Sequence, residues 1–234
     1  MEPSLQLPQP NQRLLASLEN WAQALKTQGV EKEITSRDSL LKIQELDEAQ
    51  VEAIIEFSQA NADIINSFHS KERVLEKSLL LKALNYFGLV ADDRIWNVMD
   101  DDSVVEIYGP NMKQLYRSVN FYQYSSYSLL DLAAFEWFYL WDRPKAVTEM
   151  MMVQAKQVLA EFTPVMPMTA PVHYMREIRD TGLSGKFVPR AILFSPGHVG
   201  SVKMPLSSAP VGLMCMSKGD VIAVGNDTFK VGIV

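Results

Sequence analysis

Apolar residues in the first hundred positions recur every three or four residues, which is the spacing of one face of an α-helix. One stripe runs from Leu14 to Leu25 and stops before Gly29. A second begins after Asp47, a favourable N-cap residue, and continues to Phe68. The pattern therefore predicts at least two amphipathic helices in this part of the chain.

A third stripe begins near Ser70 and runs to Phe87, where Gly88 ends it, and the segment 34–44 predicts a shorter helix. Helices of this length are not stable alone in water, so each apolar stripe must be buried. The stripes can pack on one another as a small bundle, or on a second copy of the chain. We expect at least part of the helical region, residues 10–97, to mediate self-association.

The pattern changes after residue 100. Segments 103–109 and 113–119 are rich in strand-forming residues and flank the turn sequence Gly109-Pro110-Asn111, which predicts a hairpin. Helical patterns follow over 128–135 and 145–162. Strand-like pieces then fill the remainder, at 172–180, 186–194, 211–217, 220–226 and 228–234. This order predicts an α+β fold, in which an antiparallel sheet follows the helical region and is covered by helices on one face.

Composition narrows the class of partner. With 47% hydrophobic and 21% charged residues, the chain can build a core. Its net charge of -6 offers no general attraction to phosphate backbones, so we expect no nucleic-acid partner. No apolar run reaches the ~18 residues of a membrane-spanning helix, and the N-terminus has no secretory pattern. We therefore expect no membrane partner and a cytoplasmic location.

The stretch from Val104 to Pro144 resembles the front half of a PAS domain. The positions that match this family's pattern are its polar turn, the end of its second strand, its tyrosine step, its acidic-leucine step and its closing turn. They are occupied here by Gly109-Pro110-Asn111, Asn120-Phe121, Ser126-Tyr127-Ser128, Asp131-Leu132 and Asp142-Arg143-Pro144. The resemblance covers about residues 98–224, with Ser126 in place of the usual glycine.

The apolar pattern and the resemblance together predict a flexible tail (1–9), the helical region (10–97) and a PAS-like domain with extra C-terminal strands (98–234). The resemblance also implies that Tyr127 and Leu132 lie on the sheet while Asp131 faces outward.

An unusual number of aromatic side chains lies between Phe121 and Trp141. The resemblance places them where the middle helices meet the sheet, which is the ligand pocket of the family. Two interpretations stay open: the rings form a packed core only, or the core also lines a small-molecule cavity. The residues that we expect to line such a cavity are Tyr124, Tyr127, Trp137, Phe138, Met151 and Tyr174. The sequence indicates neither the identity of a ligand nor any cofactor.

Candidate chemistry elsewhere is sparse. Heme-binding PAS domains carry a histidine on the long middle helix, but 145–162 has none, which leaves His173, on a predicted strand, as the candidate ligand. His198 falls in a Gly-rich segment expected to be a loop. Cys215, between two methionines on a predicted strand, is expected to be a buried, inert thiol. We expect 100–103 to be a solvated linker and 181–186 a hairpin turn.

These observations favour a sensory or regulatory protein that is not an enzyme. A ligand or partner would shift the packing of the helix at 145–162, and the change would pass to the helices before Asp100. The expected partners are a second copy of the chain, another signalling or regulatory protein, and a small hydrophobic ligand. The alternatives are a ligand-free interaction module and an enzyme that uses His173 or His198 with nearby carboxylates.

Overall fold

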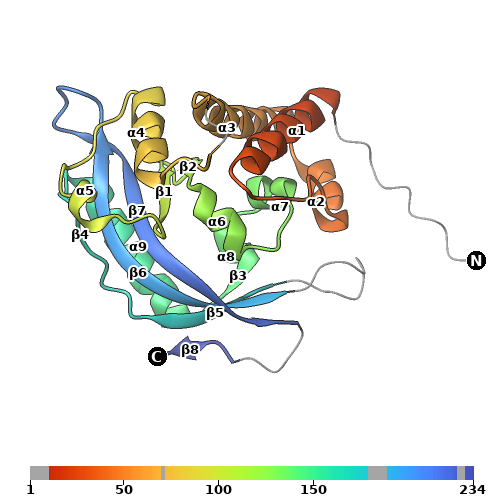
Figure 1. Cartoon of the computed structure of the whole chain (residues 1–234). Coiled ribbons are helices and arrows are strands. Elements are labelled where there is room, and N and C mark those ends of the chain that lie inside the picture. Colours follow the sequence, from red (N-terminus) through yellow and green to blue (C-terminus); the bar gives the residue numbers. More distant parts are fainter. Residues whose placement is uncertain (1–10, 70–71, 179–188, 226–229) are drawn as a thin grey trace, which may run out of the picture.

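The computed structural model of the chain describes residues 11–69, 72–178, 189–225 and 230–234, and it has the α+β fold that the pattern predicts (Figure 1). Helices come first, and an antiparallel sheet with further helices follows. The expected tail at 1–9, the cap at Ser70 and the turn at 181–186 lie outside the described residues.

Local sequence signals position the first helices. The side chain of Asn11 accepts a hydrogen bond at the start of the first helix, and Gly29, with φ +78°, follows its end. Asp47 and Gln50 form a reciprocal capping box at the start of the longest helix. The elements are α1 (Gln12–Thr27), α2 (Arg37–Lys42), the 3₁₀ turn η1 (Ile43–Glu45) and α3 (Glu48–Asn66).

The next helix is shorter than its apolar stripe suggests. Helix α4 (Glu76–Tyr86) begins after Leu75, whose side chain is 59% exposed, and Gly88 follows its end with φ +62°. One further turn of helix, α5 (Ile95–Val98), precedes the sheet.

The stripes of these helices are buried within the chain itself. The ring of Trp21 on α1 packs edge-to-face on Phe57 of α3 at 5.4 Å and on Tyr122 at 5.3 Å. The same hydrophobic cluster includes Ile107 and Met214 of the sheet. One core therefore continues across the boundary expected near residue 97, and self-association of the helices stays a prediction.

The described residues form a sheet of eight strands, and the order along its main path is β2-β1-β7-β6-β5-β3. Strands β1 (Val104–Tyr108) and β2 (Gln114–Arg117) form the predicted hairpin. The long strands β6 (Arg190–Lys203) and β7 (Pro210–Val224) pair along their whole length and curve through the molecule (Figure 1). The remaining strands are β3 (Trp141–Asp142), β4 (Met166–Pro167), β5 (His173–Glu177) and β8 (Gly232–Ile233).

Two expectations for the C-terminal strands are wrong. Segments 211–217 and 220–226 are not separate pieces, because β7 runs on through Lys218 and Gly219. His198 lies within β6 and not in a loop. The Pro-Gly sequence before it is a bulge, where a side chain on Gly197 would come within 2.9 Å of the main-chain oxygen of Met216.

Four helices lie between the hairpin and β4. The pattern predicts α7 (Leu129–Ala134) and α9 (Lys145–Ala160), whereas α6 (Val119–Tyr124) and α8 (Trp137–Leu140) are additions that the structure reveals.

Alternate residues of β1 and β7 belong to two hydrophobic clusters, one on each face of the sheet. Ile107 and Met214 pack with the N-terminal helices, and Tyr108 and Leu213 pack with α9. Helices therefore cover both faces at this end of the sheet.

Asp131 does not face outward as expected. It is fully buried, and its carboxylate accepts hydrogen bonds from Ser128 N (2.9 Å), Ser128 Oγ (2.6 Å) and Ser36 Oγ (2.7 Å). As the N3 residue of the α7 capping box, it turns back over the start of its own helix, where α2 also contacts it.

Among the described residues, no helix is both long enough and apolar enough to cross a membrane.

Candidate functional site

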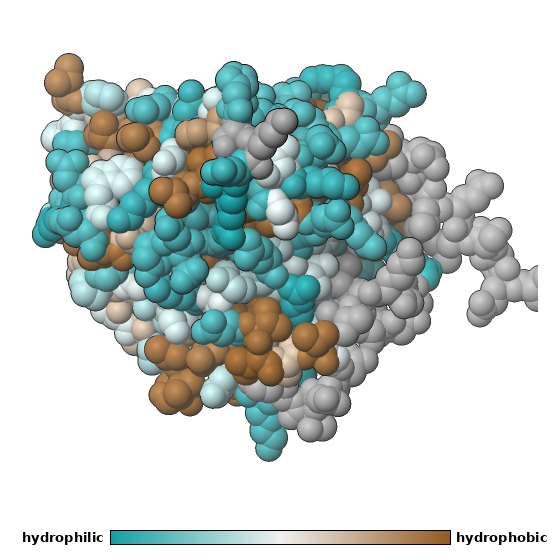
Figure 2. All heavy atoms as spheres, in the orientation of Figure 1, coloured by the Kyte–Doolittle hydropathy of each residue, from teal (hydrophilic) through white to brown (hydrophobic). Residues whose placement is uncertain are grey.

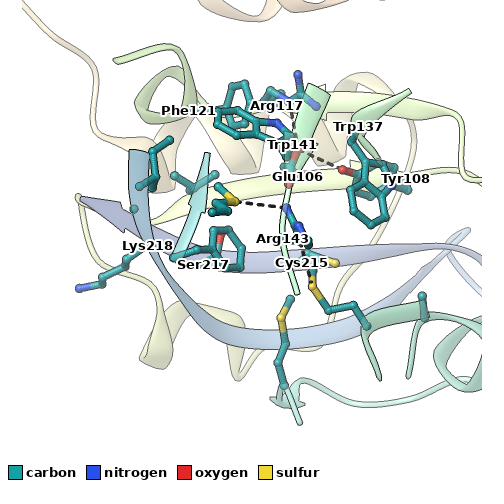
Figure 3. Close-up of a pocket in the computed structure, with 18 of the residues that line it drawn as sticks. Glu106, Tyr108, Arg117, Phe121, Trp137, Trp141, Arg143, Cys215, Ser217 and Lys218 are labelled. Atoms are coloured by element: carbon teal, nitrogen blue, oxygen red, sulfur yellow. Dashed lines mark hydrogen bonds and ion pairs between the residues drawn. The ribbon is translucent and has the colours of Figure 1, made fainter. Parts of the chain in front are cut away.

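A cavity of about 90 Å³ lies between the sheet, α6, α8 and α9 (Figure 3). Strand alternation builds its floor, because every second residue of β1 and of β7 points to the same side. Those residues are Val104, Glu106, Tyr108, Leu213, Cys215 and Ser217. The walls are mainly aromatic and methionine side chains, including Phe121, Tyr124, Trp137, Trp141, Met151, Met152, Met168, Met175 and Phe194.

One ion pair lies in the wall of this cavity. Arg117 on β2 stands opposite Glu106 on β1, and its Nε donates to Glu106 Oε1 at 3.0 Å. The same oxygen accepts from the hydroxyl of Tyr108 at 3.0 Å and from Gln114 Nε2 at 2.8 Å. Burial raises the pKa of Tyr108 well above its usual value, so its hydroxyl remains a donor. The hydrogen bonds of Glu106 are thus made to side chains of its own hairpin, β1–β2.

Arg143 is the second guanidinium group in the cavity, and it has no such partner. Its Nη1 and Nη2 atoms lie 3.1 Å and 3.4 Å from the sulfur atoms of Met151 and Met175. The group also lies over the rings of Trp137 (4.8 Å) and Phe194 (5.4 Å). Its Nε is buried without a hydrogen-bond partner, and no described carboxylate lies within ion-pair distance. Figure 3 shows the group in the middle of the cavity.

The charge on Arg143 persists at neutral pH. Burial lowers the pKa of this guanidinium to about 10, and the negative charge of Glu106 opposes part of that shift. A group with a pKa of about 10 is still almost fully protonated at pH 7. At neutral pH the cavity therefore contains a cation among apolar side chains.

The structure brings together half of the residues expected at a ligand site. Tyr124, Trp137 and Met151 line the cavity. Tyr127 does not: it lies in the core and packs edge-to-face on Trp141 at 5.7 Å. Tyr127 also donates its hydroxyl hydrogen to the main-chain oxygen of Leu140.

Two more expected residues lie elsewhere. Phe138 lines a second, larger hollow of about 490 Å³ between α3, the β1–β2 turn and the α7–α8 segment, and it is 43% exposed. Tyr174 lies on the other face of β5 from Met175, because adjacent strand residues point in opposite directions.

Sequence reasoning did not single out Arg143, Glu106 or Arg117. Two signals in the sequence could have found them. Arg143 is one of few charged residues in the aromatic stretch, and the predicted hairpin register places Glu106 opposite Arg117.

The histidines and the cysteine take no part in a cluster. His173 is buried on β5 with its Nδ1 2.9 Å from the main-chain oxygen of Pro171, and burial lowers its pKa. His198 pairs with Met216 in the sheet. Within the described ranges, no three His, Cys, Asp or Glu side chains could hold a metal ion. Burial raises the pKa of the Cys215 thiol, which keeps it protonated and poorly nucleophilic.

Comparisons with known proteins give no family: no protein-family model matches the chain, and no curated protein matches it. The geometry of the cavity and the contacts around it are therefore the basis for inferring a function.

Proposed function

We propose that the protein is a cytoplasmic sensory or regulatory protein whose PAS-like domain binds a small ligand in this cavity. It would act by binding and conformational change and not by catalysis. The order of elements supports the resemblance: a hairpin, short helices, one longer helix and then strands follow one another as the PAS pattern implies. The aromatic stretch also lines a hollow, as a ligand-binding domain requires.

The observation that carries the proposal is the position of α6. Phe121 and Tyr124 on this helix line the cavity. Tyr122, between them, packs on Trp21 of α1, and the main-chain N–H of Asn120 donates to Glu76 of α4 at 3.0 Å. A ligand that moves one face of α6 must also move the other, so the helix couples the cavity to the N-terminal helices.

The route differs from the one expected from the sequence, which passes through the helix at 145–162. Helix α9 contributes Met151, Met152 and Ala155 to the cavity, and it packs mainly on β6 and β7. Coupling through α6 is therefore the shorter path to the helices before residue 100.

Hydrogen exchange with mass-spectrometric detection tests this coupling. Native mass spectrometry of the purified protein first reports the subunit count and any co-purified small molecule. Exchange is then compared between the protein with that molecule and the protein after its removal. We expect slower exchange in α1, α3 and α4 with the ligand present. Slower exchange confined to the cavity walls would overturn the sensory proposal.

Self-association and a signalling partner remain part of the proposal. The apolar stripes of α1 and α3 are used within the chain, so a dimer needs other surfaces. Figure 2 shows apolar side chains gathered at the lower edge of the molecule, over the ends of the strands. Exposed apolar residues in these strands are Val221, Ile222, Val224 and Ile233. A monomeric mass would contradict the expected homodimer.

A second candidate function is a ligand-free interaction module. The exposed aromatic residues Phe138 and Tyr139 favour it, since they are 43% and 63% exposed beside the larger hollow. A purified protein without any bound small molecule, whose stability does not change with ligands, would favour this module over the sensor.

A further inference from the structure

The cavity wall carries unbalanced charge. Two guanidinium groups, those of Arg117 and Arg143, face the single carboxylate of Glu106. Lys218 stands at the rim and is paired outside the cavity with Asp100. Because Glu106 is bonded to Arg117, the excess positive charge belongs to Arg143.

A buried arginine without a charged partner lowers the stability of the folded protein. A guanidinium has five N–H donors and no acceptor, and a charge withdrawn from water is stabilised only when it is paired and hydrogen-bonded. Thioether sulfur is a weak acceptor, and the Nε of Arg143 has no acceptor among the residues that the structure describes. A buried polar group without a partner in a native structure calls for an explanation, and a ligand that pairs with it is one.

The surroundings define what could satisfy this charge. The side chains around Arg143 are the rings of Trp137 and Phe194 and the thioethers of Met151 and Met175. A planar carboxylate matches the fork of a guanidinium in a bidentate pair, and an apolar tail matches rings and methionines. The cavity, at about 90 Å³, accepts only a small molecule.

We propose that the ligand is a small apolar monocarboxylate whose carboxylate group binds the guanidinium of Arg143. This inference rests on the proposed function only in taking the cavity as the ligand site. A neutral apolar ligand would leave Arg143 unpaired, and a metal cation would be repelled by it. A dianion such as phosphate would bring two charges to a wall with an excess of one.

Matched pairs of probes test the proposal on the full chain. Acetate, butanoate and benzoate are each compared with the corresponding primary amide, which keeps shape and loses charge. Binding is measured by calorimetry and by tryptophan fluorescence, since Trp137 and Trp141 line the cavity. We expect at least one carboxylate to bind about tenfold or more tightly than its amide, as for hydrogen bonds to charged groups.

Variants show which group is responsible. Arg143→Met should abolish the difference between carboxylate and amide, and Arg143→Lys should keep part of it. Arg176→Gln is the matched control, because Arg176 is on β5, half-exposed and paired with Asp142 at 3.1 Å. It should bind like the unaltered chain. Without ligand, Arg143→Met should melt at the same temperature or higher, because it removes a buried unpaired charge.

The outcomes separate the two proposals. Equal binding of carboxylate and amide, or no carboxylate binding at all, overturns the monocarboxylate inference. The sensory function then still stands or fails on the co-purified ligand and on exchange in the N-terminal helices. Carboxylate binding that depends on Arg143 supports the inference even when exchange in those helices does not change.

Discussion

The ammonium group of Lys32 donates a hydrogen bond to the main-chain oxygen of Tyr127 at 3.1 Å and another to that of Ser125. This contact joins the segment after α1 to the loop between α6 and α7. The same two segments meet again where the main-chain N–H groups of Leu129 and Leu130 donate to the oxygens of Glu33 and Ile34. Lys32 is thus a polar link between the N-terminal helices and the helices beside the cavity.

The link predicts a rise in stability with pH. Burial, together with the nearby Arg190, lowers the pKa of Lys32 from 10.5 to about 7, although Glu177, Asp131 and Glu33 oppose this. Above pH 7 the folded protein releases this proton while the unfolded chain keeps it. The free energy of unfolding therefore increases as pH rises through this window.

Urea denaturation at pH 7, 8 and 9 measures the effect. We expect the unfolding free energy of the unaltered chain to rise by on the order of 1–2 kcal/mol relative to Lys32→Met. Lys26→Met is the control, because Lys26 is exposed in a surface pair with Glu31. A constant difference between the chain and Lys32→Met would contradict the prediction.

Glu76 predicts the opposite pH dependence. It is buried at the start of α4, its Oε2 has no described partner, and Arg73 is 3.9 Å from its Oε1. Burial raises its pKa from 4.5 to about 7, with a smaller contribution from Asp101, whereas hydrogen bonds from Asn120 and Val119 and the charge of Arg73 lower it. The folded state therefore holds a proton that the unfolded chain has lost between these values, and stability falls as pH rises across them.

Glu76→Gln should remove this cost, because an amide oxygen can still accept from Asn120 N. At pH 8 we expect the variant to be more stable by about 2 kcal/mol, with the gain gone near pH 4.5. Glu48→Gln is matched in position, since Glu48 is the first residue of α3 and is exposed. It should change stability little at either pH. A destabilised Glu76→Gln at pH 8 is the result that sinks this account.

Substitution of Asp131 measures how much a buried capping box contributes to the free energy of unfolding. Asp131→Ala leaves the main-chain N–H of Ser128 and the hydroxyl of Ser36 without this acceptor inside the protein. We expect a loss of about 3 kcal/mol in the free energy of unfolding. Gln50→Ala removes the equivalent N3 side chain from the exposed box of α3 and should cost under about 1 kcal/mol. Equal losses would show that burial does not matter here.

Removal of the hydroxyl oxygen of Tyr127 tests whether this residue contributes to stability without contributing to ligand binding. Tyr127→Phe removes the hydroxyl that accepts from Ile178 N at 2.9 Å and donates to Leu140 O. Thermal or urea unfolding should show a loss of about 1–2 kcal/mol, because a buried hydrogen-bonding group is lost. Butanoate binding should not change, since Tyr127 lies outside the cavity. Tyr86→Phe, at an exposed hydroxyl, should change neither quantity; weaker binding by Tyr127→Phe would place this residue in the site.

Local signals in the sequence explain what could be predicted. The capping residue Asp47, the turn at Gly109-Pro110-Asn111 and the prolines on either side of α9 act within a few residues of themselves. Helices α6 and α8 have no side-chain cap and are only six and four residues long, so they depend on packing. The continuity of β7 through Gly219 likewise depends on its long pairing with β6.

The candidate site also combines features that local sequence predicts with features that depend on tertiary packing. Aromatic residues can be assigned to the region of the cavity from their density, but the face that each occupies depends on element boundaries. The sequence predicts Tyr174 in the cavity, but its neighbour Met175 lies there, which is a difference of one strand position. The isolation of Arg143 is a tertiary property, since it depends on Glu106 being engaged by another arginine from the next strand.

The contacts of Trp21 have a practical consequence for protein engineering. Its indole touches α3 on one side and α6 on the other, so the interior belongs to both halves of the polypeptide at once. A fragment expressed from residue 98 onward would expose Tyr122, which packs on Trp21 in the full chain, and we expect it to aggregate. Chimeras that transplant the sheet into another protein must therefore carry α1 and α3 with it.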